Sequence, residues 1–227
     1  MQTLYIANKN YSSWSLRPWI LLRVLGVPFD ERLVPFAAGS NWKTFRAFSP
    51  TGKVPCLVDG ETAVWDSLAI AEYVAERHPE AWPRDATARA FARCAAAEMH
   101  SGFSALRTQC SMNCSIRVRL HGIDDALRRD LSRLDELWGE GLATFGGPFL
   151  TGASFTAVDA FYAPVAFRIR TYGLPMQPEA RAYADRLLAL PAMQEWDRAA
   201  LAESWRDAGH EEEIAQWGEI VEDLRVA

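Results

Sequence analysis

The stretch that decides the fold of this chain is Phe48-Ser49-Pro50-Thr51-Gly52-Lys53-Val54-Pro55-Cys56-Leu57, followed after a short strand by Asp66-Ser67. Val54-Pro55 stands at the start of a strand, where a cis peptide bond is accessible because it costs only about 0.5–1 kcal/mol before proline. A cis bond turns the N–H and C=O of Val54 outward, so that they can pair with an extended peptide. Asp66 and Ser67 stand where a strand becomes a helix, and a hydroxyl with free N–H groups attracts a carboxylate there. These features predict a receptor for a short, charged peptide.

The composition is ordinary for a globular protein. The chain has 227 residues, enough for one large domain or two small ones, and 49% are apolar and 23% charged. The formal net charge is −5 with both signs interleaved, which argues against a broad basic face for nucleic acid. The start lacks the pattern of a signal peptide, and no apolar run approaches the roughly 20 residues that span a bilayer. We expect neither nucleic acid nor a membrane as partner.

Four cysteines are present: Cys56, Cys94, Cys110 and Cys114. They could form two bridges, but a chain of this length does not need them. Cys110 and Cys114 share an expected helix, yet no other Cys or His spacing completes a metal site. We predict four reduced thiols, a cytosolic (cytoplasmic) protein and no metal.

The first third has the pattern of a strand, a helix and a strand, followed by a hairpin and a second helix. Strands are expected at 2–7, 29–35, 54–58 and 62–65, and helices at about 13–25 and 67–77. Pro18 fits the first turn of the first helix, and Asp59-Gly60 provides the hairpin turn. This order predicts a thioredoxin-like arrangement. Its right-handed crossover brings the start of the first helix and the Val54-Pro55 turn to one end of the sheet.

Residues 79–88 have the composition of a linker, and beyond them the pattern is helical almost throughout. Helices are expected at 87–110, 123–144, 156–171, 178–189, 191–203 and about 211–224. Thr156-Ala157-Val158-Asp159 is a Thr-x-x-Asp form of the capping box, in which hydroxyl and carboxylate satisfy free backbone donors. We expect it to start a buried helix and to take no part in chemistry.

With its Val-Pro turn, acidic residue and serine, the first third resembles the glutathione S-transferase family. The capping box resembles the one that these proteins carry at the same place, so the resemblance covers nearly the whole chain. It implies a two-domain α+β architecture, the GST fold. A thioredoxin-like glutathione-binding domain would occupy 1–80, a linker 81–88, and an all-α helical domain with the electrophile pocket and dimer contacts 89–227.

Tyr11-Ser12-Ser13-Trp14-Ser15-Leu16-Arg17 lies where the first strand gives way to the first helix. Thioredoxins place Cys-x-x-Cys here, because a helix N-terminus stabilises a thiolate. This chain has Ser12-x-x-Ser15, so we do not expect redox exchange by its own thiols. A serine hydroxyl can instead hydrogen-bond to the thiolate of bound glutathione, which favours its ionisation and its attack on an electrophile.

The same segment is similar to the Ser-Ser-Cys-x-x-Arg signature of the zeta class, which includes maleylacetoacetate isomerases. The resemblance implies that Ser12 or Ser13 is the catalytic partner of the thiolate and that Arg17 is a nearby positive charge. Trp14 replaces the signature cysteine, and two extra residues separate the first strand from the serines, so Tyr11 stays a candidate as a phenolic donor. The alternative is that a serine merely caps the helix, although both roles can coexist.

For the peptide part of glutathione, Val54 beside Pro55 is expected to bind through its main chain. Ser67 and its neighbouring N–H are expected to receive the γ-glutamyl carboxylate, and Asp66 to attract the ammonium group. A simple helix cap is the alternative for Ser67.

Lys53 precedes the Val54-Pro55 turn and is expected to pair with the glycyl carboxylate. Trp42 and Lys43 are further candidates from the segment before it. The alternative for Lys53 is a solvated surface lysine.

The second substrate is expected against the helical half. Met99, Phe103 and Arg107 recur every four residues and so share one helix face, which is also the pattern of core or dimer packing. Together with Tyr11 they are the predicted electrophile pocket, and His100 on the same helix is expected to be structural. Zeta enzymes place an arginine late on the helix that follows the capping box. Thr171 occupies that position here, with Arg168 and Arg170 before it.

We therefore predict a serine-type, zeta-like, bacterial-type glutathione S-transferase, acting in detoxification as a homodimer. It would conjugate glutathione, its co-substrate, to small apolar electrophiles. One alternative is glutathione-dependent cis–trans isomerisation, in which the thiolate adds and leaves again. Another is a noncatalytic glutathione-binding or regulatory module. Arginines near the acceptor pocket would favour an acidic isomerase substrate, and poor sulfur geometry at Ser12 and Ser13 would favour the module.

Overall fold

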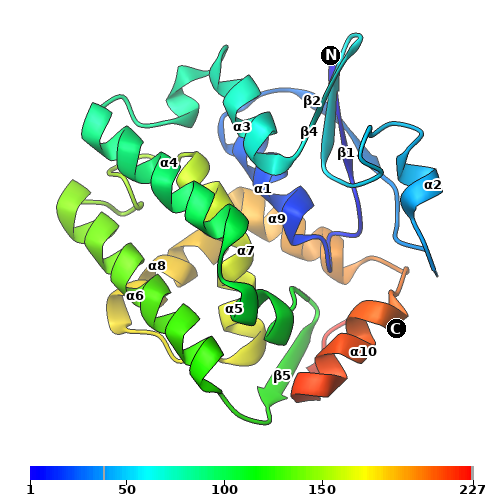
Figure 1. Ribbon diagram of the computed structural model, residues 1–227, viewed down its shortest axis with the longest axis vertical. Coiled ribbons are helices and arrows are strands. Elements are labelled where there is room, and N and C mark those ends of the chain that lie inside the picture. Colours follow the sequence, from blue (N-terminus) through cyan, green and yellow to red (C-terminus); the bar gives the residue numbers. More distant parts are fainter. Residues whose placement is uncertain (38, 226–227) are drawn as a thin grey trace.

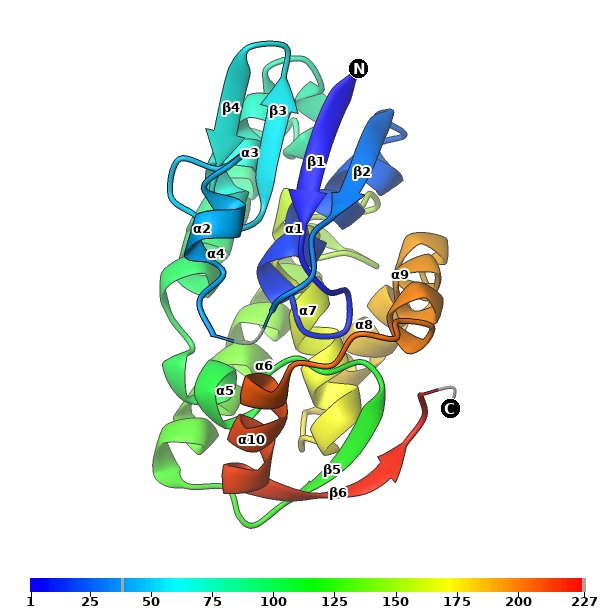
Figure 2. The ribbon, with the colours of Figure 1, turned by 90° about the vertical axis from the view of Figure 1, so that its right-hand side faces the viewer.

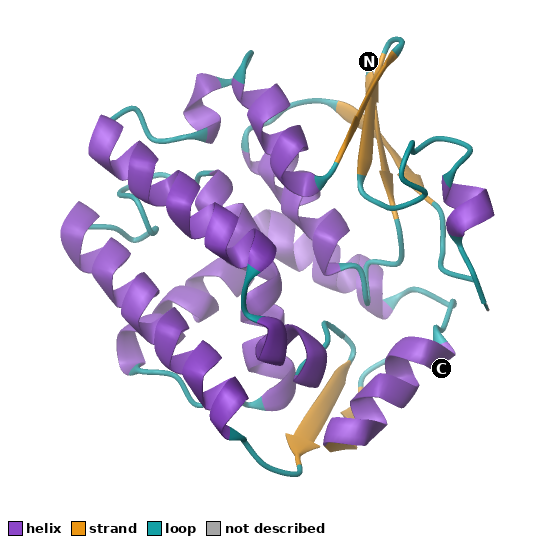
Figure 3. Cartoon of the chain, viewed as in Figure 1, coloured by secondary structure: helices purple, strands orange, loops and turns teal. Residues whose placement is uncertain are grey.

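The structure is a computed structural model that describes residues 1–37 and 39–225 (Figure 1). A sheet and its covering helices form the first third, and helices make up most of the remainder (Figure 3). The first third contains β1 (Gln2–Ile6), α1 (Ser13–Val24), β2 (Phe29–Leu33), α2 (Trp42–Phe45), β3 (Cys56–Asp59), β4 (Thr62–Trp65) and α3 (Ser67–Ala75). The remainder contains η1 (Pro79–Ala81), α4 (Ala86–Ser101), α5 (Ser104–Gln109), β5 (Ile116–Leu120), α6 (Asp125–Phe145), α7 (Ala157–Tyr172), α8 (Pro178–Leu188), α9 (Pro191–Leu201), α10 (Ala208–Trp217) and β6 (Gly218–Asp223).

The sheet of the first third has the strand order β2-β1-β3-β4. The β1 strand runs parallel to β2 and antiparallel to β3, and β3 and β4 form the hairpin. Figure 2 shows α1 and α3 behind this sheet and α2 in front of it. The predicted thioredoxin-like arrangement is confirmed. It brings the start of α1 and the Val54-Pro55 turn to the same end of the sheet.

The α7 helix is the centre of the helical domain. Fifteen of its residues are buried, and it packs against α1, α4 and α8. The predicted capping box starts it: the Thr156 N–H donates to Asp159 Oδ2 at 2.9 Å. Asp159 Oδ1 also accepts from the Leu150 N–H at 3.1 Å and from the Tyr183 hydroxyl at 2.8 Å. The carboxylate therefore fixes the start of α7 to two other segments.

Two expectations for the helical half are wrong in detail. The helix expected at 87–110 is interrupted at Gly102-Phe103, because Phe103 adopts a left-handed backbone with φ 55°. The helix expected near 211–224 ends at Trp217, and 218–223 form β6, which pairs antiparallel with β5. Gly218 permits this turn into a strand, since a Cβ there would lie 2.6 Å from Val118 Cγ1. The second domain is thus helical with an added two-stranded sheet.

All four cysteines, each among the described residues, have free thiols. In the described part of the chain, none of the helices has the length and apolar character needed to cross a membrane.

Candidate active site

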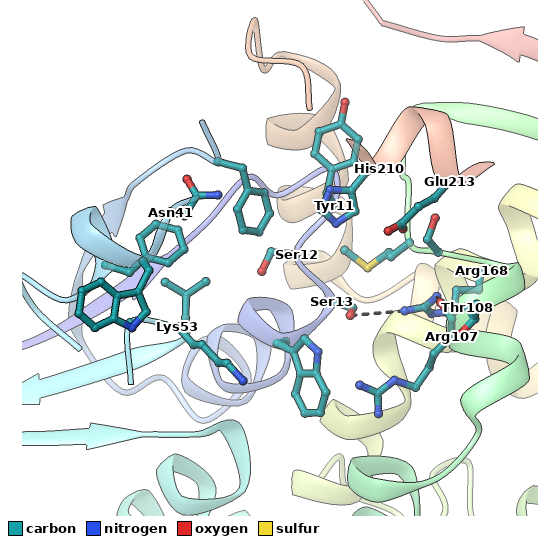
Figure 4. A pocket seen from close by; sticks show the side chains of 18 of the residues that line it. Tyr11, Ser12, Ser13, Asn41, Lys53, Arg107, Thr108, Arg168, His210 and Glu213 are labelled. Carbon is teal, nitrogen blue, oxygen red and sulfur yellow. Dashed lines mark hydrogen bonds between the residues drawn. The ribbon is translucent and has the colours of Figure 1, made fainter. Parts of the chain in front are cut away.

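A cavity of about 930 Å³ lies where the sheet domain meets the helical domain. Its walls come from the start of α1, the α2–β3 segment, α5 and the loop after it, α7, and α10 (Figure 4). The lining residues are Tyr11, Ser12, Ser13, Trp14, Phe36, Asn41, Trp42, Phe45, Thr51, Gly52, Lys53, Val54, Arg107, Thr108, Ser111, Met112, Arg168, His210, Glu213, Gln216 and Trp217.

A second cavity of about 540 Å³ adjoins the first and shares part of its lining. The shared residues are Trp14, Thr51, Lys53, Val54 and Arg107, and the second cavity adds Pro55, Trp65, Asp66 and Ser67. The two spaces together extend from the β4–α3 junction to the helical domain, which suits an elongated ligand with an attached second group.

The Val54-Pro55 bond is cis, as the sequence predicts. The β3 strand begins only at Cys56, so Val54 lies outside the ladder that joins β3 to β1. Within the described residues, we find no hydrogen bond to the N–H or C=O of Val54. Its main-chain groups therefore stay available at the wall that both cavities share.

Asp66 and Ser67 start α3 in different ways. Asp66 Oδ1 accepts from the Leu68 N–H at 2.8 Å, so the aspartate rather than the serine caps the helix. Ser67 is 1% exposed and its hydroxyl has no hydrogen-bond partner. A buried hydroxyl without a partner costs about 1–3 kcal/mol, which a bound carboxylate would relieve. The alternative role for Ser67, a simple helix cap, is therefore wrong, because Asp66 caps α3.

The two serines at the start of α1 differ in the use of their hydroxyl groups. The Ser12 hydroxyl donates to Ser15 Oγ at 2.7 Å, and that oxygen also accepts from the Ala7 N–H at 3.2 Å. The Ser13 oxygen instead accepts from Arg168 Nη2 at 3.4 Å, a bond drawn in Figure 4, so its proton is free to be donated. Ser12 stands at the N-cap of α1, but its side chain makes no capping hydrogen bond to the helix. Of these two serines, Ser13 therefore has the available hydroxyl proton.

The Tyr11 hydroxyl points away from the two serines (Figure 4). It donates to Glu211 Oε1 at 2.9 Å, and it accepts from the Asp207 N–H at 3.4 Å. Burial, reinforced by the Glu211 carboxylate, raises the pKa of Tyr11 above its ordinary value. Tyr11 lines the cavity with its ring, while its hydroxyl serves the contact with α10.

Two arginines, Arg107 and Arg168, line this part of the cavity, and a third, Arg17, is buried behind the Trp14 ring. The Arg17 and Arg107 guanidinium groups lie 4.0 and 4.4 Å from the centroid of the Trp14 ring. Arg17 is 2% exposed, and its Nε and Nη1 atoms lack hydrogen-bond partners. Burial, with the charges of Arg107 and Arg168, lowers the pKa of Arg17 to about 9. Burial likewise lowers the pKa of Arg168 to about 10. The site thus holds concentrated positive charge that a bound anion would neutralise.

Lys53 and Trp42 reach the cavity from the sheet domain. The Lys53 side chain points toward the side from which Arg107 enters (Figure 4). Trp42 is 60% exposed and covers Gly52, where a Cβ would lie 2.7 Å from Trp42 Cδ1. Gly52 also has φ +64°, a conformation that favours glycine. Lys43, by contrast, is exposed and lines neither cavity.

Two predicted residues of the electrophile pocket lie elsewhere. Met99 and Phe103 are buried in the hydrophobic core and line neither cavity. Met99 lies on the buried face of α4, and the break at Gly102-Phe103 means that it does not share a helix face with Arg107. Arg107, the third member of that series, does line both cavities. His100 packs edge-on against the Trp14 ring, with 5.2 Å between ring centroids, and its Nε2 lies 3.5 Å from Asp66 Oδ2. Burial lowers the pKa of His100, in keeping with a structural role.

Most of the residues that line the cavity from the helical domain were not predicted from the sequence. It consists of Thr108, Ser111 and Met112 around the end of α5, Arg168 on α7, and four residues of α10: His210, Glu213, Gln216 and Trp217. Arg168 could be considered from its place late on α7, but α10 offered no motif. Within the described residues, no group of three or more His, Cys, Asp or Glu side chains could hold a metal ion.

The fold and the cavity define a thioredoxin-like domain joined to a helical domain, with a ligand site at their junction. A family model described as glutathione S-transferase, N-terminal domain, matches residues 11–77, and one described as glutathione S-transferase, C-terminal domain, matches residues 80–199. The chain belongs to the glutathione S-transferase family.

Its similarity to zeta-class relatives extends over most of the chain. Glutathione S-transferase Z1 of Arabidopsis thaliana is 28% identical in an alignment of 216 residues, which covers 88% of this chain and 94% of the relative. A probable maleylacetoacetate isomerase of Caenorhabditis elegans is 24% identical over 77% of this chain and 82% of the relative. Among solved structures, a glutathione transferase homologue from Burkholderia with bound glutathione superimposes with a TM-score of 0.67. Its identity is 22%, with 88% of this chain and 97% of that one covered, so it supports the fold alone.

Proposed function

We propose that this protein binds glutathione and conjugates its thiolate to a small electrophile, with Ser13 as the hydroxyl that stabilises the sulfur. The peptide part of glutathione would lie along Val54, with its γ-glutamyl carboxylate on Ser67 and its glycyl carboxylate near Lys53. The electrophile would occupy the part of the larger cavity that Tyr11, Met112 and α10 line.

The observation that carries this proposal is the free proton of the Ser13 hydroxyl, beside the start of α1. Because Arg168 Nη2 donates to the Ser13 oxygen, the hydroxyl is held by a cation and is a better donor toward an anion. A hydrogen bond to the charged form of a thiol lowers its pKa. Glutathione bound there would be ionised near neutral pH and ready to attack.

Thiolate absorbance measured against pH, with each variant saturated with glutathione, tests the assignment. We expect Ser13→Ala to raise the pKa of bound glutathione by about 1–2 units, because one hydrogen bond to a charged acceptor is lost. Ser12→Ala and Tyr11→Phe serve as matched controls and should titrate like the wild type. A shift in Ser12→Ala alone would reassign the donor. No heat of binding at millimolar glutathione would contradict the proposed function itself.

The arginines favour a second candidate, glutathione-dependent isomerisation of an acidic substrate. Arg107 and Arg168 line the larger cavity, and the Caenorhabditis relative is named as a probable maleylacetoacetate isomerase. The test compares a cis-enedione bearing a carboxylate with its methyl ester. If this candidate holds, Arg107→Gln lowers kcat/KM for the acid by about 10–100-fold and leaves the ester unaffected. Arg119→Gln, whose wild-type side chain pairs with Glu219 on the surface, is the control.

We also propose that the chain forms a homodimer in the cytoplasm, with the domains divided at residues 81–88. Two-fold pairs are the commonest oligomers, and α4 with the edge of the sheet domain is the expected contact. Light scattering at micromolar concentration should give twice the 25.4 kDa of the single chain. A particle of single-chain mass would contradict the dimer.

A further inference from the structure

The α10 helix brings an Asp–His pair to the wall of the larger cavity. His210 Nδ1 lies 2.9 Å from Asp207 Oδ1, three residues earlier in the chain. The same carboxylate oxygen accepts from the His210 backbone N–H at 3.0 Å, so Asp207 also caps α10. The carboxylate places the Nδ1 proton, and this leaves Nε2 as the ring nitrogen that is not engaged with Asp207.

The His210 ring is held between two aromatic rings. The Tyr11 ring is stacked at 5.1 Å between centroids with an interplanar angle of 26°, and the Phe36 ring is stacked at 5.3 Å with 27°. Two rings therefore stack on the imidazole and Asp207 engages Nδ1, while the Nε2 edge of the ring makes no hydrogen bond within the described residues. The side chain is 30% exposed and is one of the residues that line the larger cavity (Figure 4).

Neighbouring carboxylates leave that edge of the ring free. Glu211 is occupied by the Tyr11 hydroxyl and by Arg206 and Arg225. Glu213 lines the same cavity but makes no ion pair within the described residues. A fixed imidazole with a carboxylate behind it and an open nitrogen in a substrate cavity is the arrangement of a general acid–base group.

We propose that His210 is a catalytic acid for addition of glutathione to α,β-unsaturated carbonyl compounds, and that Asp207 is its positioning residue. This inference rests on the proposed function. The thiolate forms a C–S bond to the β-carbon, and the C=C electron pair moves so that negative charge develops on the carbonyl oxygen. The Nε2–H of the protonated ring donates its proton to that oxygen. The enol then exchanges protons with water to give the ketone, and the ring regains its proton from solvent.

The experiment compares two substrates that differ in their need for a proton. Displacement of chloride from 1-chloro-2,4-dinitrobenzene forms a C–S bond and expels an anion, so it requires no acid. We expect His210→Phe, which keeps the aromatic stack, to lower kcat for an α,β-unsaturated ketone by roughly 100-fold. The aryl chloride rate should change less than about threefold in the same variant. His78→Gln, in a residue that lines neither cavity, is the matched control.

Asp207→Asn keeps a good helix cap while removing the negative charge behind the ring. We expect it to lower kcat for the ketone and to leave KM and the helix content by circular dichroism unchanged. Equal losses for both substrates in His210→Phe, or ketone kinetics like those of the wild type, would overturn the inference. A wild-type protein that turns over the aryl chloride but not the ketone would also overturn the inference, while the proposed function would stand. A wild type that binds no glutathione and uses neither substrate would overturn both.

Discussion

The two walls of the cavity are built in opposite ways. The wall from the sheet domain draws on short, contiguous stretches, Tyr11–Trp14, Thr51–Pro55 and Trp65–Ser67, each at a boundary between elements. The wall from the helical domain draws on single side chains that project from α5 and the loop after it, α7 and α10, and these three elements lie far apart in the chain. The first wall offers the free main-chain groups of Val54 and the serine hydroxyls among aromatic rings. The second offers mainly charged and polar side chains, such as Arg107, Arg168 and Glu213. Local sequence therefore determines the expected glutathione side, and the packing of distant helices determines the expected electrophile side.

The largest expected effect tests whether the helical wall depends on one remote carboxylate. Asp159→Ala leaves the buried Leu150 and Thr156 N–H groups and the Tyr183 hydroxyl without their acceptor. Each unsatisfied buried donor costs about 1–3 kcal/mol, so we expect the free energy of unfolding to fall by about 3–5 kcal/mol. Urea denaturation measures it.

Asp85→Ala is the matched control, because Asp85 caps α4 from an exposed position by accepting from the Ala88 N–H at 2.8 Å. Its loss should cost only about 1 kcal/mol. Equal costs for the two variants would mean that the start of α7 is no more demanding than an ordinary surface cap.

The next effect concerns the sheet-domain wall. Ser67→Ala removes the buried hydroxyl that has no partner in the free protein, so it should leave stability unchanged or slightly increased. Glutathione affinity should fall by about 1–3 kcal/mol, because the bound carboxylate loses a donor. Calorimetric titration measures it, with Ser101→Ala on the surface of α4 as the control. Unchanged affinity would remove the Ser67 hydroxyl from the proposed glutathione site.

A smaller effect separates backbone strain from ligand binding. Gly52→Ala and Gly60→Ala both place a side chain at positive φ, +64° and +62°, which costs roughly 1–2 kcal/mol. Only at Gly52 does the new Cβ meet Trp42, while Gly60 has open space. We expect similar losses of stability, but a rise in KM for glutathione of several-fold in Gly52→Ala alone. If both variants keep the wild-type KM, Trp42 has no part in the glutathione site.

The contrast between the walls also explains what could be predicted from the sequence. Val54-Pro55 and Thr156–Asp159 are local motifs whose geometry follows from a few neighbouring residues, and both have the expected form. The prediction that Met99 and Phe103 line the electrophile pocket is wrong. It requires a single helix through 87–110, whereas Phe103 adopts a left-handed backbone that interrupts that helix. The periodicity of apolar residues does not report such a break, since the helices on both sides keep their own pattern.

The α10 wall could not be predicted for another reason. Ile220 and Val221 are β-branched residues that favour a strand, but the choice between helix and strand after Trp217 depends on β5, about 100 residues earlier. Likewise, the choice between Ser12 and Ser13 depends on Arg168, which tertiary packing brings to the Ser13 oxygen. Neither the strand after Trp217 nor the choice between the two serines could therefore be predicted from its neighbouring residues alone.

The smallest expected effect tests how α10 is held against the sheet-domain wall. Burial alone would raise the pKa of Glu211, but hydrogen bonds from Arg206, Arg225 and Tyr11 hold it at about 2. The pKa is lowered from an ordinary 4.5, so the stabilisation is fully present above pH 4.5 and is lost as the pH falls through about 2. After allowance for solvent screening we expect Glu211→Gln to cost about 1 kcal/mol at pH 7. Hydrogen-exchange protection of the α10 amides, compared with the wild type at each pH, measures this cost, and the difference should shrink below pH 4.5.

Glu219→Gln is the matched control, because the Arg119–Glu219 pair is exposed and should contribute little. If both variants lower the protection of α10 equally, Glu211 does not hold that helix to Tyr11, and the helical wall is positioned by the β5–β6 pairing instead.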